Sequence, residues 1–446
     1  MAGKGVSPED QVPARDGGCR TLRAMSSRLD LGTAVALNQH CQCVSMDEAL
    51  LAHALAQEGA SFGLAELIAS HPHLFSRSAV FVDEPTRRAM RDVVAAVERV
   101  VALPAYQELA LAGAHPHARV ATPTRGVFLG YDFHVTQDGP QLIEINTNAG
   151  GALLNAVLRR AQRACCDPVA EALGLGDEQL AQRFLAMFRA EYALARPGAA
   201  LRSVAIADDD PPSQYLFPEM VLFERLFASA GIDAVVCDAR ELEIRDGALA
   251  HRGRPIDLVY NRLTDFALAE PAHGALARAH REGLAVVTPH PRAHALYADK
   301  QRLVTLSDGE ALRGLSVAPA DVDLLVRHVP RTVAVDPGQR EALWKDRRQL
   351  FFKPRSGYGS RAAYRGDKLT RRVFERLLEE PYVAQRIVPP SARVLRVGDE
   401  TRALKVDIRN FAYAGEIQLV CARLYAGQTT NFRTEGGGFA PVYAAA

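Results

Sequence analysis

The sequence lacks the features that mark several large classes of protein. Its seven cysteines form no C-x-x-C pair and no disulfide-like framework, which indicates reduced thiols. No apolar run approaches the roughly 20 residues of a membrane-spanning helix, and the N-terminus lacks a signal-type apolar core, so we expect a cytoplasmic protein with no membrane partner. The net charge is only +1, and no basic stripe with interleaved aromatic residues occurs, so no nucleic-acid partner is expected.

A Walker-type phosphate loop is also missing, because no G-x-x-x-x-G-K-[ST] string occurs anywhere in the chain. What the chain does have is length and apolar content. Its 446 residues are 48% hydrophobic, which is typical of a globular protein with two or three subdomains. Because the Walker-type loop is missing, any nucleotide site must be built from other motifs.

Two apolar-rich runs predict an early β-hairpin. The runs span residues 127–135 and 141–145, and Asp138-Gly139 between them is a strong hairpin turn signal. A hairpin of this kind places residues from both arms side by side.

Polar residues on this hairpin are candidate metal ligands. Side chains alternate between the faces of a strand, so Glu144 and Asn146 point the same way, and the hairpin can bring Asp132 beside them. Two carboxylates and an amide oxygen are hard ligands that suit Mg²⁺. The alternative interpretation is the ordinary solvated face of an antiparallel sheet.

A second segment, late in the chain, is basic and rich in glycine. Residues 350–353 predict a strand that ends at Lys353, and residues 356–360 form a turn whose backbone amides can approach phosphate oxygens. We interpret the turn as a candidate phosphate-covering loop, and an ordinary connection between strands is the alternative.

A predicted second hairpin spans residues 403–424 and turns at Ala414-Gly415. Arg409 lies near its first arm and Arg423 at the end of its second. Arginine is always charged and binds phosphate or carboxylate oxygens in a bidentate way, so both are candidate anion clamps. Surface ion pairs are the alternative for each.

Helices and a second sheet are predicted between these segments. Ser45 and Glu48 match a capping box that opens a helix, and Pro85 opens another helix with one apolar stripe. From residue 203 to residue 288, strands and helices alternate, which argues for a parallel α/β sheet. The acidic turn at 208–212 follows its first strand, where such sheets bind ligands, although a solvated turn is the alternative.

Together these motifs resemble a known family. The late lysine, the G-x-G turn, the short strand with Gln385 and the string Asp407-Ile-Arg-x-Phe resemble the C-terminal part of an ATP-grasp enzyme. The early carboxylate–amide string resembles the metal-binding strands of the same fold, which ordinarily come after the loop and here come first. The chain is therefore similar to circularly permuted ATP-grasp proteins, such as glutathionylspermidine synthases and eukaryotic-type glutathione synthetases. The resemblance implies an α/β (α+β) fold with a small parallel-sheet domain before the nucleotide site.

The resemblance also implies a division of the chain. Residues 1–30 are expected to form a flexible arm, and residues 31–195 a helical region with the metal-binding hairpin. Residues 196–310 would form the α/β domain, and residues 311–446 the nucleotide-binding region.

Carried over by position, the resemblance assigns Asp132, Glu144 and Asn146 to Mg²⁺. It places Arg409 and Arg423 toward the transferring phosphoryl group, with Asn431 near metal and substrate. The residues expected to bind ATP are Lys300, Lys353, Gly357, Gly359, Ser360, Tyr382, Val383 and Gln385.

Two positions depart from the family pattern. Gly130 stands where glutathionylspermidine synthases carry an arginine, and Gly357 stands where animal-type glutathione synthetases carry a metal-binding glutamate. Both departures argue against glutathione or its precursor dipeptide as substrate. The implied activity is an ATP- and Mg²⁺-dependent ligation of a small-molecule carboxylate and an amine through an acyl phosphate. The alternatives are a kinase-like phosphotransferase and a non-catalytic nucleotide-binding module.

Overall fold

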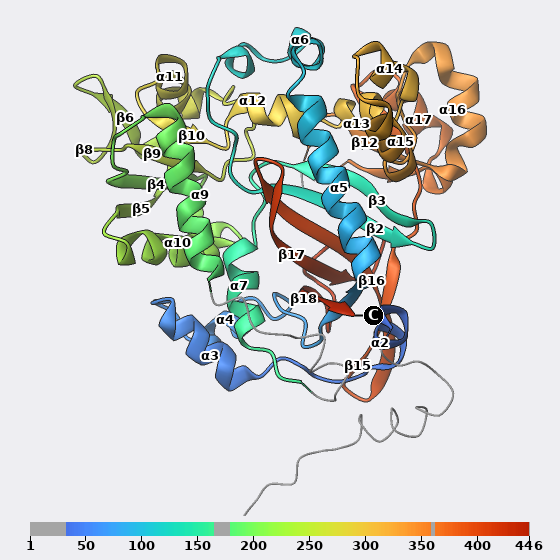
Figure 1. Ribbon diagram of the computed structural model, residues 1–446, viewed down its shortest axis with the longest axis horizontal. Coiled ribbons are helices and arrows are strands. Elements are labelled where there is room, and N and C mark those ends of the chain that lie inside the picture. The colour runs from blue at the N-terminus through green and yellow to red at the C-terminus, as the bar shows by residue number, and fades with distance from the viewer. Residues whose placement is uncertain (1–32, 165–178, 358–361, 446) are drawn as a thin grey trace, which may run out of the picture.

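A seven-stranded sheet forms the centre of the molecule (Figure 1). The computed structural model describes residues 33–164, 179–357 and 362–445. The strands of the sheet are β1 (Val80–Asp83), β2 (Leu129–Thr136), β3 (Gly139–Asn146), β15 (Ser391–Val397), β16 (Glu400–Tyr413), β17 (Glu416–Tyr425) and β18 (Gly438–Ala445). Their order is β1-β18-β17-β16-β2-β3, and β15 pairs with the first part of β16. The sheet thus combines strands from both ends of the chain.

Both predicted hairpins are present. β2 and β3 are joined at the expected Asp138-Gly139 turn, where Gly139 has a φ of +98°, a value that favours glycine. β16 and β17 are joined at Ala414-Gly415. The second part of β16 pairs antiparallel with β2, so the two hairpins lie side by side in one sheet.

One face of the sheet is covered by helix α5 (Glu84–Val101), which crosses it in Figure 1. Asp83 caps the helix by accepting a hydrogen bond from the Thr86 amide, and Pro85 lies in the first turn, where its missing N–H costs nothing. The predicted apolar stripe is confirmed. Its buried members are Met90, Val93, Val94, Val97, Val100 and Val101.

The opposite face of the sheet is divided into an apolar end and a polar end. At the apolar end, helices α7 (Ala152–Arg160) and α9 (Leu180–Ala195) share a core with Phe411 and Cys421. At the polar end, Asp407, Arg409 and Arg423 continue the same rows of side chains, because alternate residues of β16 and β17 share a face. This polar end carries the candidate site.

The N-terminal helices lie at the lower edge and the top of the sheet in Figure 1. They are α2 (Ala34–His40), α3 (Glu48–Gln57), α4 (Leu64–Ser70), α6 (Pro104–Ala112) and the 3₁₀ turn η1 (Pro116–Arg119). The predicted cap of α3 was wrong: Asp47 accepts the capping bond from the Leu50 amide, at 2.9 Å. The Ser45 hydroxyl instead donates to Gln162, because α3 begins two residues later than the capping box requires.

The alternating region forms a parallel sheet, as predicted. Its strands, in the order β10-β9-β4-β5, are β4 (Ser203–Asp208), β5 (Asp233–Asp238), β9 (Leu258–Asn261) and β10 (Val286–Thr288). Helices α10 (Phe217–Ser229) and α11 (Gly274–Glu282) pack against it. A small antiparallel sheet adds β6 (Leu242–Arg245), β7 (Ala248–His251) and β8 (Arg254–Pro255). Short 3₁₀ turns are η2 (Pro211–Ser213), η3 (Ala239–Glu241) and η4 (Pro271–His273).

A short helical segment leads from this unit to a second antiparallel sheet at the right of Figure 1. The segment holds α12 (Pro291–Ala293), the π-helical turn η5 (His294–Ala298), α13 (Gln301–Leu306), α14 (Gly309–Gly314) and α15 (Pro319–His328). The sheet, in the order β11-β14-β12-β13, contains β11 (Thr332–Ala334), β12 (Leu350–Pro354), β13 (Tyr364–Arg365) and β14 (Tyr382–Arg386). It is covered by α16 (Arg340–Asp346) and α17 (Arg371–Leu377), with 3₁₀ turns η6 (Pro337–Gln339), η7 (Arg347–Gln349) and η8 (Gly366–Lys368).

Strands β15–β18 leave this lobe and return to the central sheet. The strand pairing therefore crosses the boundaries at residues 195 and 310, and the division into domains stays a prediction. Among the described helices, none is both long enough and apolar enough to cross a bilayer. Cys237 and Cys421 are buried free thiols.

Candidate active site

A cavity of about 680 Å³ lies between the central sheet, the parallel sheet and the β11–β14 sheet. Its volume falls in the range usual for small-molecule sites, roughly 300–1,000 Å³. The central sheet contributes His134, Glu144, Asn146, Asp407, Arg409 and Arg423. The β11–β14 lobe contributes Phe351, Lys353, Gln385 and residues 386–390. The parallel α/β unit contributes Asp208, Gln214, Tyr215, Arg262, Thr264 and Phe266. One cavity therefore joins residues that are far apart in the chain, from His134 to Thr430.

The β2–β3 hairpin brings the three predicted metal ligands together. Asp132 is directly opposite Glu144, because the register shifts between Asp132 and Phe133. The Asn146 amide nitrogen donates to Asp132 Oδ2 at 3.0 Å and to Glu144 Oε1 at 3.1 Å. The Asn146 amide nitrogen thus binds both carboxylates. No described group donates a hydrogen bond to the Asn146 side-chain oxygen.

Asp132 is bound by two arginines from the neighbouring hairpin. Arg409 donates to both carboxylate oxygens, each at 2.6 Å, and Arg423 donates to Asp132 Oδ2 at 2.7 Å. Burial raises the pKa of Asp132 to about 6, while the positive charges of Arg409 and Arg423 oppose that rise. Asp132 is fully buried and is not part of the cavity wall.

A further carboxylate, Asp407, belongs to this cluster and was not predicted as a site residue. Its Oδ2 accepts hydrogen bonds from Arg423 and, at 2.8 Å, from the Thr430 hydroxyl. Its Oδ1 is buried without a partner among the described residues, and so is Nε of Arg423. The D-I-R string contained the signal, since Asp407 lies two residues before Arg409 and shares its face.

Glu144 has a different electrostatic environment. It is half-buried on the cavity wall and makes no ion pair with any described side chain. Burial opposes its charge, but the nearby Lys300 and Lys353 outweigh that effect and hold the pKa of Glu144 well below its usual value. Glu144 is therefore ionised across the physiological pH range.

The two predicted lysines are held by neutral oxygens. Lys353 Nζ donates to the Ile143 carbonyl at 2.9 Å and to Gln385 Oε1 at 2.8 Å. Lys300 Nζ donates to the Gly357 carbonyl at 3.0 Å. Burial lowers the pKa of Lys353 to about 8, with Glu144 opposing the change.

Three residues of β14 were expected to bind ATP, and only Gln385 of the three belongs to the cavity wall; their role in ATP binding stays a prediction. Gln385 lines the cavity, but Tyr382 donates its hydroxyl hydrogen to the Ala362 carbonyl, and Val383 is buried opposite Lys353 within the sheet. The wall is formed instead by residues 386–390, just beyond β14. Of the predicted phosphate loop, Gly357 is described, and Gly359 and Ser360 lie outside the described residues.

Asn431, a predicted site residue, makes its side-chain hydrogen bonds within its own loop. Its amide nitrogen donates to the carbonyls of Ala426 and Thr429, and its oxygen accepts from the Arg433 amide. Asn431 is not part of the cavity wall, whereas residues 428–430 are. Its role near metal and substrate stays a prediction.

At the far end, the cavity reaches the carboxyl edge of the parallel sheet. Asp208 ends β4 and Arg262 directly follows β9, and both line the cavity. Burial raises the pKa of Asp208 to about 6, and the nearby Arg262 opposes that rise. The acidic turn was recognised in the sequence; Arg262 was missed, although polar residues after parallel strands mark this edge.

The cluster offers oxygen ligands of the kind that Mg²⁺ prefers. Glu144 and the Asn146 oxygen face the cavity and lack other partners, so they fit a hard cation with water and phosphate as its remaining ligands. Asp132 fits less well, because Arg409 and Arg423 occupy its oxygens. Among the described residues, no group of three or more His, Cys, Asp or Glu side chains forms a metal cage.

Comparison with known proteins concerns the fold. A glutathione synthetase-like effector from Globodera pallida is 11% identical, with 90% of this chain and 98% of that chain covered and a TM-score of 0.53. A gamma-glutamylcysteine synthetase-like protein from Methylobacillus flagellatus is 10% identical, with 80% and 87% covered and a TM-score of 0.41. The ATP-grasp ligase PsnB, complexed with minimal precursor, Mg and ADP, is 16% identical, with 54% and 87% covered and a TM-score of 0.27.

The last two scores are too low to carry an argument. No protein-family model matches the sequence. No curated protein matches it either. The likeness to the effector extends over nearly the whole of both chains and bears on the fold alone. The protein has the mixed α/β ATP-grasp fold that its motifs predicted, and the permuted order of the halves stays a prediction.

Proposed function

We propose that the protein is an ATP- and Mg²⁺-dependent ligase that joins a small carboxylate to an amine. The observation that carries this proposal is the composition of the cavity. At one end it has Glu144, Asn146 and Lys353, a lysine that makes no ion pair with any described residue, and at the other end it has Asp208 and Arg262. Lys300 is not part of the cavity wall, but it lies near enough to Glu144 to lower the pKa of that carboxyl. The first set suits a nucleotide, and the second suits a polar substrate.

The nucleotide end supplies charge that a triphosphate requires. Lys300 and Lys353 would bind phosphate oxygens, because neutral carbonyl and amide oxygens are weaker partners for an ammonium group. Glu144 and Asn146 would hold Mg²⁺, which when bound neutralises phosphate charge and orients the triphosphate. Residues 386–390 would surround the base.

The proposed reaction proceeds in two steps. The substrate carboxylate attacks the γ-phosphoryl group of ATP, which releases ADP and leaves an acyl phosphate. The amine then attacks the acyl carbon, and phosphate leaves as the amide forms. Arg423 would support the first step, because its Nε lacks a partner among the described residues and Arg423 lines the cavity. Residues 428–430 would help to exclude water from the acyl phosphate.

The test is product analysis with purified protein, Mg²⁺ and ATP. A pool of amino acids, small peptides and polyamines is supplied, and ADP, phosphate and condensed products are measured together. Ligation gives all three, and an acid offered with hydroxylamine in place of the amine gives a hydroxamate. ADP with a phosphorylated compound and no free phosphate would indicate the kinase-like alternative. Nucleotide binding without any ADP would indicate a binding module.

A further inference from the structure

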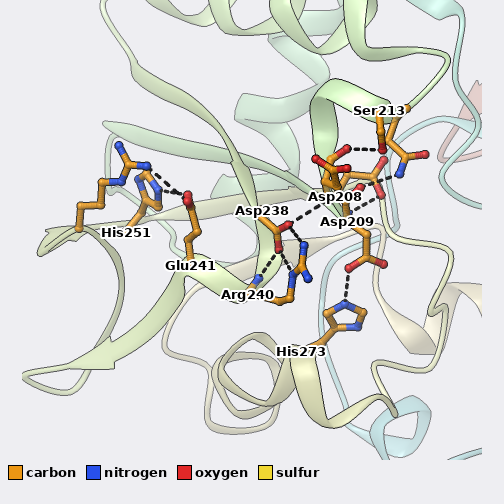
Figure 2. Close-up of polar contacts among 11 residues, drawn as sticks. Asp208, Asp209, Ser213, Asp238, Arg240, Glu241, His251 and His273 are labelled. Carbon is orange, nitrogen blue, oxygen red and sulfur yellow. Dashed lines mark hydrogen bonds and ion pairs between the residues drawn. The ribbon is translucent and has the colours of Figure 1, made fainter.

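The acidic turn at residues 208–212, which begins at Asp208 on the cavity wall, is tied to a second loop by a buried histidine. His273, at the end of η4, is fully buried. Its Nε2 lies 3.0 Å from Asp209 Oδ1, and its Nδ1 lies 2.9 Å from Asp265 Oδ2. Figure 2 shows the imidazole ring facing Asp209 from below the turn.

This geometry requires a protonated ring. Asp265 accepts two backbone N–H bonds, from Ala269 at 3.0 Å and Glu270 at 2.9 Å, so it is an ionised carboxylate. A neutral imidazole donates through one nitrogen only and would turn a lone pair toward an oxygen of the other aspartate. An imidazolium donates to both.

The two loops that His273 joins both line the cavity. Asp209 belongs to the turn that carries Asp208, Gln214 and Tyr215, and Asp265 lies between Thr264 and Phe266 in the loop that begins at Arg262. The bridge therefore lies just behind the end of the cavity where Asp208 and Arg262 are found. Asp208 and Arg262 also attract each other across the two loops, but no hydrogen bond or ion pair between described residues joins these two side chains directly.

We propose that His273, as an imidazolium, is a positioning residue that ties the 208–216 turn to the 262–270 loop and holds this end of the cavity in shape. When His273 loses its proton, the two loops separate and the cavity end loosens. The inference concerns the shape of the cavity and does not depend on the ligase reaction.

The protonation of His273 depends mainly on Asp209 and Asp265, because most other charged groups around it are bound to partners of their own. On η3, Arg240 is bound to Asp238, and Glu241 is bound to His251 (Figure 2). On α11, Arg278 is paired with Glu282, and Arg281 contacts His117 of η1. Other titratable groups nearby are His115, which precedes η1 and lies near Asp265, and His280 of α11, which contacts the His117 carbonyl. Arg119 of η1 donates to the Ala112 carbonyl.

The pKa of His273 is consistent with this role. Burial lowers it, but the hydrogen bonds to Asp265 and Asp209 outweigh burial and raise the pKa above the usual value. Because the pKa in the folded state exceeds that in the unfolded state, the stabilisation is complete below the unfolded value. It is lost as pH rises through the folded value.

The test is amide hydrogen exchange of the full chain, corrected for the intrinsic effect of pH. Exchange is followed from about pH 5 to about pH 8, and the ring is observed by ¹³C-histidine NMR. Peptides over 208–216 and 262–270 should lose protection as the His273 ring loses its proton. His273→Gln should exchange about tenfold faster in both peptides at low pH, as expected for the loss of one charge-assisted hydrogen bond.

Two further variants make the test specific. Asp209→Asn removes one carboxylate, so the His273 pKa and the exchange transition should move together to lower pH. His251→Gln is the matched control, because His251 has a similar 2.9 Å contact with Glu241 but lies on β7, away from both loops. It should leave both peptides unchanged. The proposal is overturned if the ring is neutral at low pH, or if Asp209→Asn shifts the ring pKa without shifting the exchange transition.

Discussion

Two groups of charges lie at the polar end of the central sheet and are satisfied in opposite ways. In the first, Asp132 and Asp407 are paired with Arg409 and Arg423 by direct ion pairs within the protein. In the second, the described partners of Glu144 and the two lysines are all neutral groups, although Glu144 attracts both lysines over longer distances. Among the described residues, every charge of the first group has an opposite charge within ion-pair distance, and no charge of the second group has one.

This difference in ion pairing separates residues whose charges join the strands of the sheet from residues whose charges are left to bind a ligand. A buried carboxylate between two guanidinium groups joins β2 to β16 and β17, and removing it would strand two positive charges. A buried ammonium group is stabilised only weakly by a neutral carbonyl oxygen. A bound phosphate would stabilise it more, because hydrogen bonds between charged groups are stronger. Four predictions test this division, from the largest expected effect to the smallest.

Replacing Glu144 by Gln should reduce turnover about a thousandfold, because the charged ligand that helps to hold Mg²⁺ is lost. The protein should remain folded, since Glu144 is half-buried and makes no ion pair. ADP release and circular dichroism are the measurements. Asp138→Asn, at the exposed tip of the same hairpin, is the control and should behave as wild type. Normal turnover of Glu144→Gln would show that the metal assignment is wrong.

Replacing Asp132 by Asn should lower the free energy of unfolding by about 3 kcal/mol, because Arg409 and Arg423 lose a buried counter-charge. Denaturant unfolding measures the effect. Glu400→Gln breaks a 2.9 Å pair with Arg402 on the same sheet, but Glu400 is 71% exposed. That control should cost less than about 1 kcal/mol. Equal costs for the two variants would remove the distinction between the clusters.

Replacing Gly130 by Ala should disturb the cluster of Asp132, Asp407, Arg409 and Arg423 without removing a charged group. An added methyl group would lie 2.8 Å from the Ala149 side chain and 3.2 Å from Arg409 Nε. The expected cost is about 1–3 kcal/mol, as for overpacking elsewhere. Denaturant unfolding of this variant, alone and combined with Asp132→Asn, gives the coupling energy. Strictly additive effects would mean that the methyl group does not act through Arg409.

Nucleotide binding should be accompanied by proton uptake at Lys353. The pKa of Lys353 is lowered to about 8 in the free protein, and a bound triphosphate favours the charged form and raises it. Binding of Mg-ATP at pH 8 should therefore take up about half a proton, and affinity should fall as pH rises further. Calorimetry in two buffers of different ionisation enthalpy measures the uptake. Lys353→Met should abolish it, and the exposed Lys345→Met on α16 should not.

Much of the fold could be predicted because the signals are local. Asp138-Gly139 and Ala414-Gly415 mark their turns regardless of the rest of the chain, and α5 is predicted by the spacing of its valines. The cap of α3 failed for the opposite reason: Ser45 and Asp47 both suit the position, and only the contact of Ser45 with Gln162 decides between them.

The site was predictable where its residues share a strand or a hairpin, as Asp132, Glu144 and Asn146 do. It was not predictable where two sheets meet. Whether Tyr382 or residue 386 faces the cavity depends on how the β11–β14 lobe lies against the central sheet, and no local pattern carries that information. The internal bonding of Asn431 depends in the same way on the conformation of its loop.

The antiparallel pairing of β2 with β16 has a consequence for biosynthesis. The two strands are joined by the Asp132–Arg409 contact, whose members are 277 positions apart in the chain. While the polypeptide is made, the early hairpin leaves the ribosome with one edge open and an acidic group unneutralised until the late strands emerge. Such distant pairing slows folding and favours off-pathway association. A chaperone that protects this nascent edge would therefore be expected to raise the yield of correctly folded protein.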